Sequence, residues 1–169
     1  MFSKVTVKFL ILAIAWVLAD LIIKYFIRSN FEPTEMTPFM NGFFSIGRIH
    51  TVRIAFGDDY NLIGYAGILF RLIVLIFFIR IWKAPVSSLF KIACVFIVAG
   101  WIGNYIDRFA FSEGNTGYVQ MDYFYINGVF DFFFSLTGII ILIGWILLLI
   151  AMIIRVNDLK ILFSRKQTK

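Results

Sequence analysis

Four long apolar runs follow one another along the chain and are separated by more polar stretches. The runs cover about residues 5–26, 62–82, 89–105 and 129–154. Each is close to the roughly 20 residues that an α-helix needs to cross a hydrocarbon layer about 30 Å thick. None alternates between apolar and polar residues as the strands of a membrane barrel do. The pattern predicts an all-α membrane protein with four transmembrane helices, organised as a single integral membrane domain, 1–169.

The basic residues lie at particular ends of these runs. Lysines flank the first run and the turn after the second, and a basic tail follows the fourth; the lysines are Lys4, Lys8, Lys83 and Lys91. Such ends remain in the cytoplasm, so we expect both termini to be cytoplasmic. The stretches at about 27–61 and 107–128 would then face outside. Residues 42–46 and 54–56 suggest short strands there, which would form a small extracytoplasmic β-like platform.

The composition supports a membrane protein and excludes several other classes. Of the 169 residues, 61% are hydrophobic and 15% are charged, whereas about a quarter of a soluble domain is charged. The net charge is +6, but the basic residues bracket apolar runs, so a nucleic-acid partner is not expected. Cys94 and His50 are the sole cysteine and histidine. We therefore expect no disulfide and no metal site.

Polar residues at membrane depth are the candidates for chemistry, because each costs about 2.5–3.5 kcal/mol at a helix centre. They are Asp20, Lys24, Arg71, Asn104, Asp107, Arg108 and Asp131, with Asp122 just outside. Asp20 and Lys24 are four residues apart, on one helix face. They form either a structural ion pair or one wall of a polar pocket.

The run from Gly100 to Arg108 is the most specific feature of the sequence. Its two glycines allow another helix to approach closely, and three polar side chains follow at helical spacing. Asp131 opens the fourth run, where an acid can act as a helix cap. Alternatively, two carboxyl groups close together in an apolar pocket can share a proton and activate a water, as in aspartic proteases.

These residues resemble the lipoprotein signal peptidases, the membrane aspartic proteases called signal peptidase II. The family motif Asp-Gln-x-x-Lys is matched by Asp20 and Lys24 without the glutamine. The motif Gly-x-x-Gly-Asn-x-x-Asp-Arg is intact from Gly100 to Arg108. Residues 118–124 resemble the element that carries one catalytic acid, with one extra residue, and they assign that role to Asp122.

Two motifs of the family are degenerate. Ala55, Phe56 and Gly57 match the end of the outer-segment motif, which begins with asparagine, but Thr51 stands in that place and Arg53 replaces a glycine. The last motif, Phe-Asn-x-Ala-Asp, carries the second catalytic acid. In one register Asp131 is that acid, although the preceding asparagine is displaced.

In the other register of this motif Asp131 takes the place of the asparagine, and Phe134 stands where the acid belongs. The dyad would then be broken. One sequence leaves both registers open.

The resemblance implies a membrane aspartic endopeptidase that removes signal peptides from lipid-modified prolipoproteins. Asp122 and Asp131 would activate the water. The acids and the substrate would be held by Asp20, Lys24 and the polar residues of the third run, which are Asn104, Asp107 and Arg108. Ala55, Phe56 and Gly57 would clamp the substrate from above. The expected location is the bacterial cytoplasmic (inner) membrane, with the site facing outward. The alternative is a catalytically silent relative that binds a lipoprotein, a lipid or a partner subunit.

Overall fold

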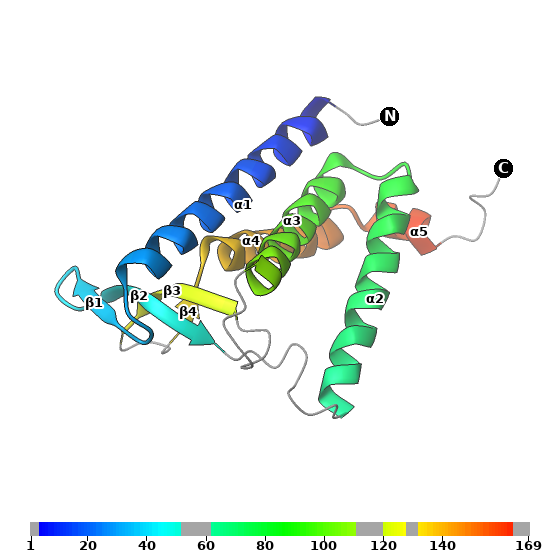
Figure 1. Cartoon of the computed structure of the whole chain (residues 1–169). Helices are drawn as coiled ribbons and strands as arrows, with labels where there is room; N and C mark the ends of the chain where they lie inside the picture. Colours follow the sequence, from blue (N-terminus) through cyan, green and yellow to red (C-terminus); the bar gives the residue numbers. More distant parts are fainter. Residues whose placement is uncertain (1–3, 52–61, 111–119, 128–131, 164–169) are drawn as a thin grey trace.

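The computed structural model describes residues 4–51, 62–110, 120–127 and 132–163, which form five helices and four strands (Figure 1). The helices are α1 (Lys4–Asn30), α2 (Leu62–Lys83), α3 (Ser88–Ala110), α4 (Leu136–Ile154) and α5 (Val156–Phe163). The strands are β1 (Met36–Phe39), β2 (Phe44–Thr51), β3 (Gln120–Ile126) and β4 (Phe132–Phe134). The protein is therefore mostly helical, with a small sheet.

Three helices are long and apolar enough to cross a membrane. They comprise Val7–Asn30, Ser88–Asp107 and Leu136–Ile154, with hydropathies of 2.2, 1.8 and 2.9. Large apolar side chains cover their outer surfaces, including Ile22, 68% exposed, and Ile153, 74% exposed. Lipid is the solvent that accommodates such a surface. α2 coincides with the second apolar run, but the described residues provide three candidate spans, so the fourth span stays a prediction.

The turn from α2 to α3 follows from the local sequence. Ala84 precedes Pro85, and the residue before a proline disfavours the helical conformation, so α2 ends at Lys83. The backbone N–H of Ser87 then donates to Oδ2 of Asp158 at 3.0 Å. This hydrogen bond ties α5 to the start of α3. Behind it, a core cluster joins the turn to the last four helices through Ile81, Ala84, Phe90, Ile97, Leu148 and Leu162.

The strands form one antiparallel sheet in the order β1-β2-β3-β4. Met40, Asn41 and Gly42 turn the chain between β1 and β2 with positive φ angles of 51°, 56° and 82°. β2 confirms the platform expected around residues 42–46, whereas residues 54–56 lie outside the described part of the chain. The platform packs on the helices through Ile27, Met121 and Tyr123, which form a buried cluster.

The predicted start of the fourth helix is wrong. Residues 132–134 form β4, and α4 begins at Leu136 rather than at 129. Phe134 pairs with Phe124 in the register of β4 against β3, and their rings stack with centroids 5.4 Å apart. Aromatic pairs across strands stabilise such a ladder. Ser135, with φ −128° and ψ 168°, is the extended residue at which the strand changes into the helix.

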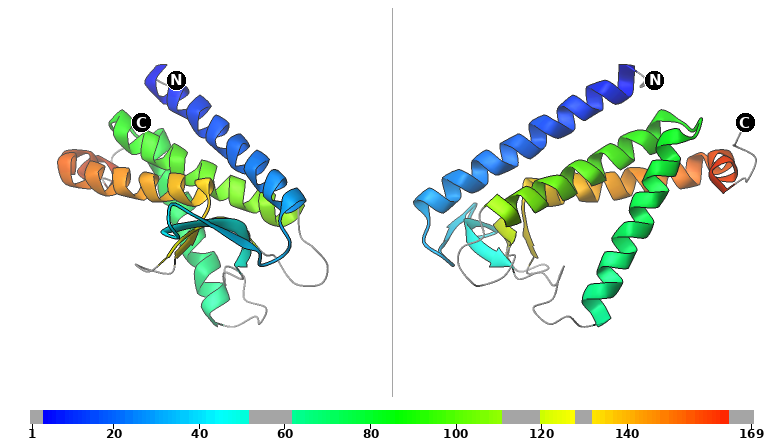
Figure 2. Two further views of the ribbon diagram at one scale, coloured as in Figure 1. Left: turned by 90° about the vertical axis from the view of Figure 1, so that its left-hand side faces the viewer. Right: turned by 45° about the vertical axis from the view of Figure 1, so that its right-hand side comes forward.

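The sheet lies at the end of the bundle where α1 finishes, and α5 lies at the opposite end. All views in Figures 1 and 2 agree on this arrangement. They also show α3 and α4 side by side, whereas α2, which precedes the 84–87 turn, diverges from both. The junction between the sheet and the ends of α1, α3 and α4 therefore brings together segments that are distant in the sequence.

The close packing of α3 on α4 depends on Gly100. A Cβ atom there would lie 2.9 Å from the carbonyl oxygen of Thr137 and 2.9 Å from Cγ2 of Ile140. We expect Gly100→Ala to destabilise the protein by about 1–3 kcal/mol, because the helices must move apart. Gly138→Ala is the matched control, since its nearest neighbour would be 3.8 Å away. Unfolding in mixed detergent micelles measures both, and equal stability of the two variants would contradict this packing.

Candidate active site

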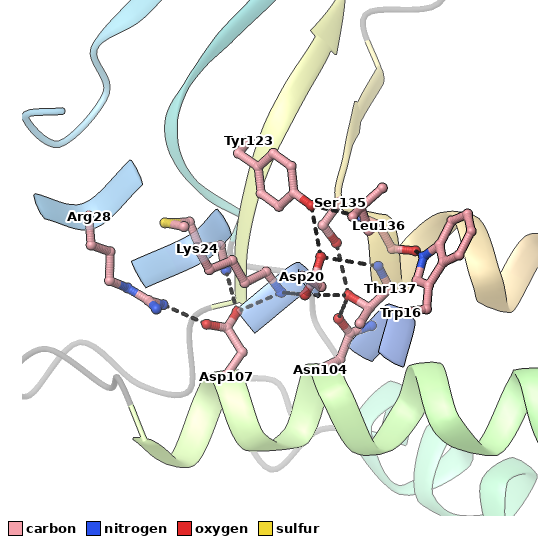
Figure 3. A network of polar contacts seen from close by, with 11 residues as sticks. Trp16, Asp20, Lys24, Arg28, Asn104, Asp107, Tyr123, Ser135, Leu136 and Thr137 are labelled. Carbon is pink, nitrogen blue, oxygen red and sulfur yellow. Dashed lines mark hydrogen bonds and ion pairs between the residues drawn. The ribbon is translucent and has the colours of Figure 1, made fainter. Parts of the chain in front are cut away.

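A chain of four alternating charges lies between α1 and α3 (Figure 3). Nζ of Lys24 is 2.9 Å from Oδ2 of Asp20 and 3.2 Å from Oδ2 of Asp107. Arg28 extends the chain, with Nη2 2.6 Å from Oδ1 of Asp107. The side chains of Asp20, Lys24 and Asp107 are completely buried, and that of Arg28 is 10% exposed. Two acids and two bases therefore neutralise one another, and the predicted Asp20–Lys24 ion pair is confirmed.

Asp20 also joins α1 to the sheet and to α4. Its Oδ1 accepts hydrogen bonds from the phenol of Tyr123 at 3.0 Å and from the backbone N–H of Thr137 at 3.1 Å. Its Oδ2 lies 3.1 Å from the hydroxyl of Thr137, in addition to Lys24. Both oxygens are therefore engaged. Asp20, on α1, therefore accepts hydrogen bonds from the first turn of α4. Because its oxygens already have donors, it is poorly suited to take a proton from a water.

Asn104 belongs to the same network through hydroxyl groups. Its Oδ1 lies 2.7 Å from Oγ1 of Thr137, and Oγ of Ser135 lies 3.1 Å from that same hydroxyl. Thr137 has one hydroxyl proton, so it donates either to Asn104 or to Asp20 at a given moment. The intact motif on α3 thus reaches the first turn of α4 through Thr137.

Asp107 connects α3 to the sheet. Besides the two cations, its Oδ2 accepts a hydrogen bond from the backbone N–H of Met121 at 3.0 Å. This contact fixes β3 against the end of α3, one residue before Asp122. Both oxygens of Asp107 are therefore engaged, as those of Asp20 are.

Asp122 is the third buried acid among the described residues, with 1% of its surface exposed. It pairs with Ile49 in the register of β3 against β2. Successive side chains of a strand project to opposite faces. Tyr123 points into the network of Asp20 in Figure 3, so Asp122 projects from the opposite face of the sheet.

Tyr123 keeps its proton in this environment. Burial raises the pKa of its phenol far above the ordinary range, and the nearby Asp20 carboxylate adds to the shift. The group therefore donates to Asp20 and at the same time accepts from the backbone N–H of Leu136 at 3.0 Å. The phenol is a bridge between α1 and the start of α4.

Several predicted site residues cannot be placed. Ala55, Phe56, Gly57 and Asp131 lie outside the described residues, as do the side chains of Arg71 and Arg108. The interpretation of Asp131 as an acid in the first helical turn is nevertheless wrong, because α4 begins at Leu136. In the part of the chain that the structure describes, no group of three or more His, Cys, Asp or Glu residues could hold a metal.

Sequence reasoning missed four members of the network: Arg28, Tyr123, Ser135 and Thr137. Arg28 carried a usable signal, because positions 20, 24 and 28 form one stripe on a helix. The other three have no such periodicity. Tyr123 and Thr137 join the network through contacts with Asp20 across more than a hundred residues, and Ser135 joins it through Thr137.

We expect Tyr123→Phe to lower the free energy of unfolding by about 1–3 kcal/mol, because Asp20 and the N–H of Leu136 both lose a buried partner. Unfolding in detergent micelles, followed by tryptophan fluorescence, measures the change. Tyr25→Phe is the control, since Tyr25 is 65% exposed on α1. A Tyr123→Phe protein as stable as this control would contradict the bridging role of the phenol.

The fold and the site define a class: a mostly helical membrane protein whose buried charges join the spans to a small antiparallel sheet. The comparisons agree with it. Two solved structures described as bacterial membrane enzymes share the fold with a TM-score of 0.65 at 21% identity, covering 89% and 99% of this chain and 94% and 96% of theirs. The family model for signal peptidase (SPase) II matches residues 12–154, and the chain belongs to that family.

Curated relatives agree with this assignment. A lipoprotein signal peptidase of Bartonella henselae is 34% identical over 136 residues, which are 78% of this chain and 79% of the relative. One of Moorella thermoacetica is 31% identical over 104 residues, 61% of this chain and 69% of the relative. The predicted resemblance is confirmed.

Proposed function

We propose that the protein is an endopeptidase that removes signal peptides from lipid-modified prolipoproteins in the bacterial cytoplasmic membrane, with its site facing outward. The membership in the signal peptidase II family supports this activity. The relatives that carry the name lipoprotein signal peptidase match most of the chain. The bond cleaved would be the one immediately before the lipidated cysteine.

The observation that carries the assignment of residues is the position of Asp122, a buried acid on the face of β3 opposite Tyr123. Asp20 and Asp107 hold the helices and the sheet together through cations and backbone amides. We assign Asp122 as one catalytic acid. It would act with a second carboxyl group, which we assign to Asp131, to activate a water against the scissile carbonyl. No metal or organic cofactor takes part in this scheme.

The remaining residues hold the acids in place. Asp20, Lys24, Asn104 and Asp107 anchor β3 and the start of α4, and we assign Arg108 to the same group. Ala55, Phe56 and Gly57 would contact the substrate from the outer segment. The proposal divides the site into a structural network and a catalytic face on opposite sides of one strand.

A second candidate function is a catalytically silent relative that binds a lipoprotein, a lipid or a partner subunit. The register of β4 favours it. Phe132 lies opposite Ile126, which is four residues from Asp122 and therefore about 13 Å along the strand. Phe134, which stands where the acid belongs in the other register of the motif, lies opposite Phe124, two residues from Asp122. The start of α4 offers the hydroxyls of Ser135 and Thr137 and no acid.

The variant Asp131→Asn tests the proposed pair. Purified protein is reconstituted with a diacylglyceryl-modified prolipoprotein, and the products of wild type and variant are measured. The proposed function predicts cleavage by the wild type and at least a hundredfold loss in the variant, the lower range for acid–base catalysis. Cleavage that survives the substitution would remove Asp131 from the pair. An inactive wild type, with an active family member run alongside, would favour the silent relative.

A further inference from the structure

Five basic residues lie on elements that meet at the end of the bundle farthest from the sheet. The last turn of α2 provides Arg80 and Lys83, and the first turn of α3 provides Lys91. Arg155 joins α4 to α5, and Lys160 lies on α5. Lys91 is half-buried, and the other four are exposed. We call these five residues the basic cluster.

The packing of α5 creates this cluster. Leu162 is buried against the α2–α3 turn in the same core cluster as Ala84 and Val86, with Leu159 packed beside it. Figures 1 and 2 show α5 next to the end of α2 from different directions. A tail that extended away from the bundle would leave Lys160 far from the lysines of the turn. The fold therefore concentrates the positive charge.

Asp158, the acid in this region, does not neutralise the positive charge of the basic cluster. Asp158 lies between Arg155 and Lys160 on α5, and its Oδ2 accepts the backbone N–H of Ser87. The carboxylate is thus directed at the first turn of α3, where it offsets the positive end of the helix dipole. The basic side chains remain available to an external anion.

Apolar and basic groups are adjacent at this end of the molecule. Arg155 is flanked by Ile153, Ile154 and Val156, which are 74%, 66% and 51% exposed. α4 is long and apolar enough to cross a membrane and its apolar stretch ends at Ile154, which would place Arg155 at the level of the lipid headgroups. A ligand that satisfies both features has an acyl chain and an anionic headgroup. A soluble phosphate would satisfy the charge alone.

We propose that the basic cluster binds the headgroup of an anionic phospholipid, with the acyl chain lying along the exposed face of α4. Clusters of lysine and arginine at the end of a transmembrane helix attract anionic lipids, each residue contributing about a fivefold change in affinity. The site is distant from the candidate active site. It fixes α5 and the α2–α3 turn at the membrane surface.

The experiment compares lipid binding to the intact chain by native mass spectrometry, with phosphatidylglycerol and phosphatidylcholine as probes. We expect tighter binding of phosphatidylglycerol. The double variant Arg155→Gln, Lys160→Gln should weaken its binding by about tenfold or more and leave phosphatidylcholine unchanged. The double variant Arg155→Lys, Lys160→Arg keeps both positive charges and should retain the preference for phosphatidylglycerol. It is the control for a loss of binding that comes from substitution of these positions and not from loss of charge.

The matched control is Lys4→Gln, Lys8→Gln, which removes the same charge from exposed positions on α1. It should leave phosphatidylglycerol binding within about twofold of the wild type, since neither residue belongs to the cluster. Equal losses in the two glutamine variants would overturn the proposal and indicate a response to net charge. Equal binding of the two lipids by the wild type would also overturn it.

Discussion

Replacing Lys24 by methionine is expected to lower the free energy of unfolding by about 3–5 kcal/mol. Lys24 lies between the carboxylates of Asp20 and Asp107, and all three side chains are buried. Methionine fills a similar volume but carries no charge. The two acids would then remain in the interior with one cation, Arg28, which contacts only Asp107 among them. Unfolding in mixed detergent micelles measures the loss.

The control for this variant is Lys8→Met, which removes a lysine from an exposed position on the same helix. It should change the stability by less than about 0.5 kcal/mol, as surface substitutions usually do. The double variant Asp20→Asn, Lys24→Met should recover part of the loss, because it removes one of the uncompensated charges. A Lys24→Met protein as stable as the control would contradict the buried charge chain.

Replacing Asp122 by asparagine is expected to reduce signal-peptide cleavage by at least a hundredfold, because an amide cannot exchange a proton with the attacking water. The two side chains have nearly the same size, and Asp122 is almost fully buried. The rate under single-turnover conditions reports the chemical step. The same assay run at saturating substrate separates the loss from a change in binding.

Glu32→Gln serves as the control for this loss, because Glu32 is exposed before β1. It should retain the wild-type rate. An unfolding transition of Asp122→Asn close to that of the wild type would separate catalysis from stability. A variant that is folded and still active would remove Asp122 from the chemistry, and Asp20 and Asp107 are poor replacements because their oxygens are already engaged.

Much of the fold could be predicted from the sequence, because the length of the apolar runs and the helical spacing of polar residues indicate the helices. The apolar runs predict the three candidate spans, since backbone hydrogen bonds must be satisfied within each helix in lipid. The spacing of Asp20 and Lys24 predicts their ion pair, because residues four apart lie on the same face of a helix. The glycines in the run from Gly100 to Arg108 predict the close approach of another helix, and Gly100 does lie against α4.

The start of α4 and the hydroxyl network were not accessible in this way. Residues 129–135 read as a continuation of the apolar run, yet Phe132–Phe134 form a strand because β3 provides a partner of aromatic residues. Such a short apolar stretch has no periodicity that separates strand from helix. Tyr123 and Thr137 likewise meet Asp20 only after the sheet has packed against the helices. Tertiary contact decides both features.

The most direct test of the account is the cleavage of a diacylglyceryl-modified prolipoprotein by the wild-type protein, with the products identified by mass spectrometry. The account predicts a free signal peptide and a mature chain that begins at the lipidated cysteine. An unmodified precursor should be cleaved more slowly, since the family's relatives are lipoprotein signal peptidases. A folded wild-type protein that leaves the substrate intact, beside an active relative, would contradict the account.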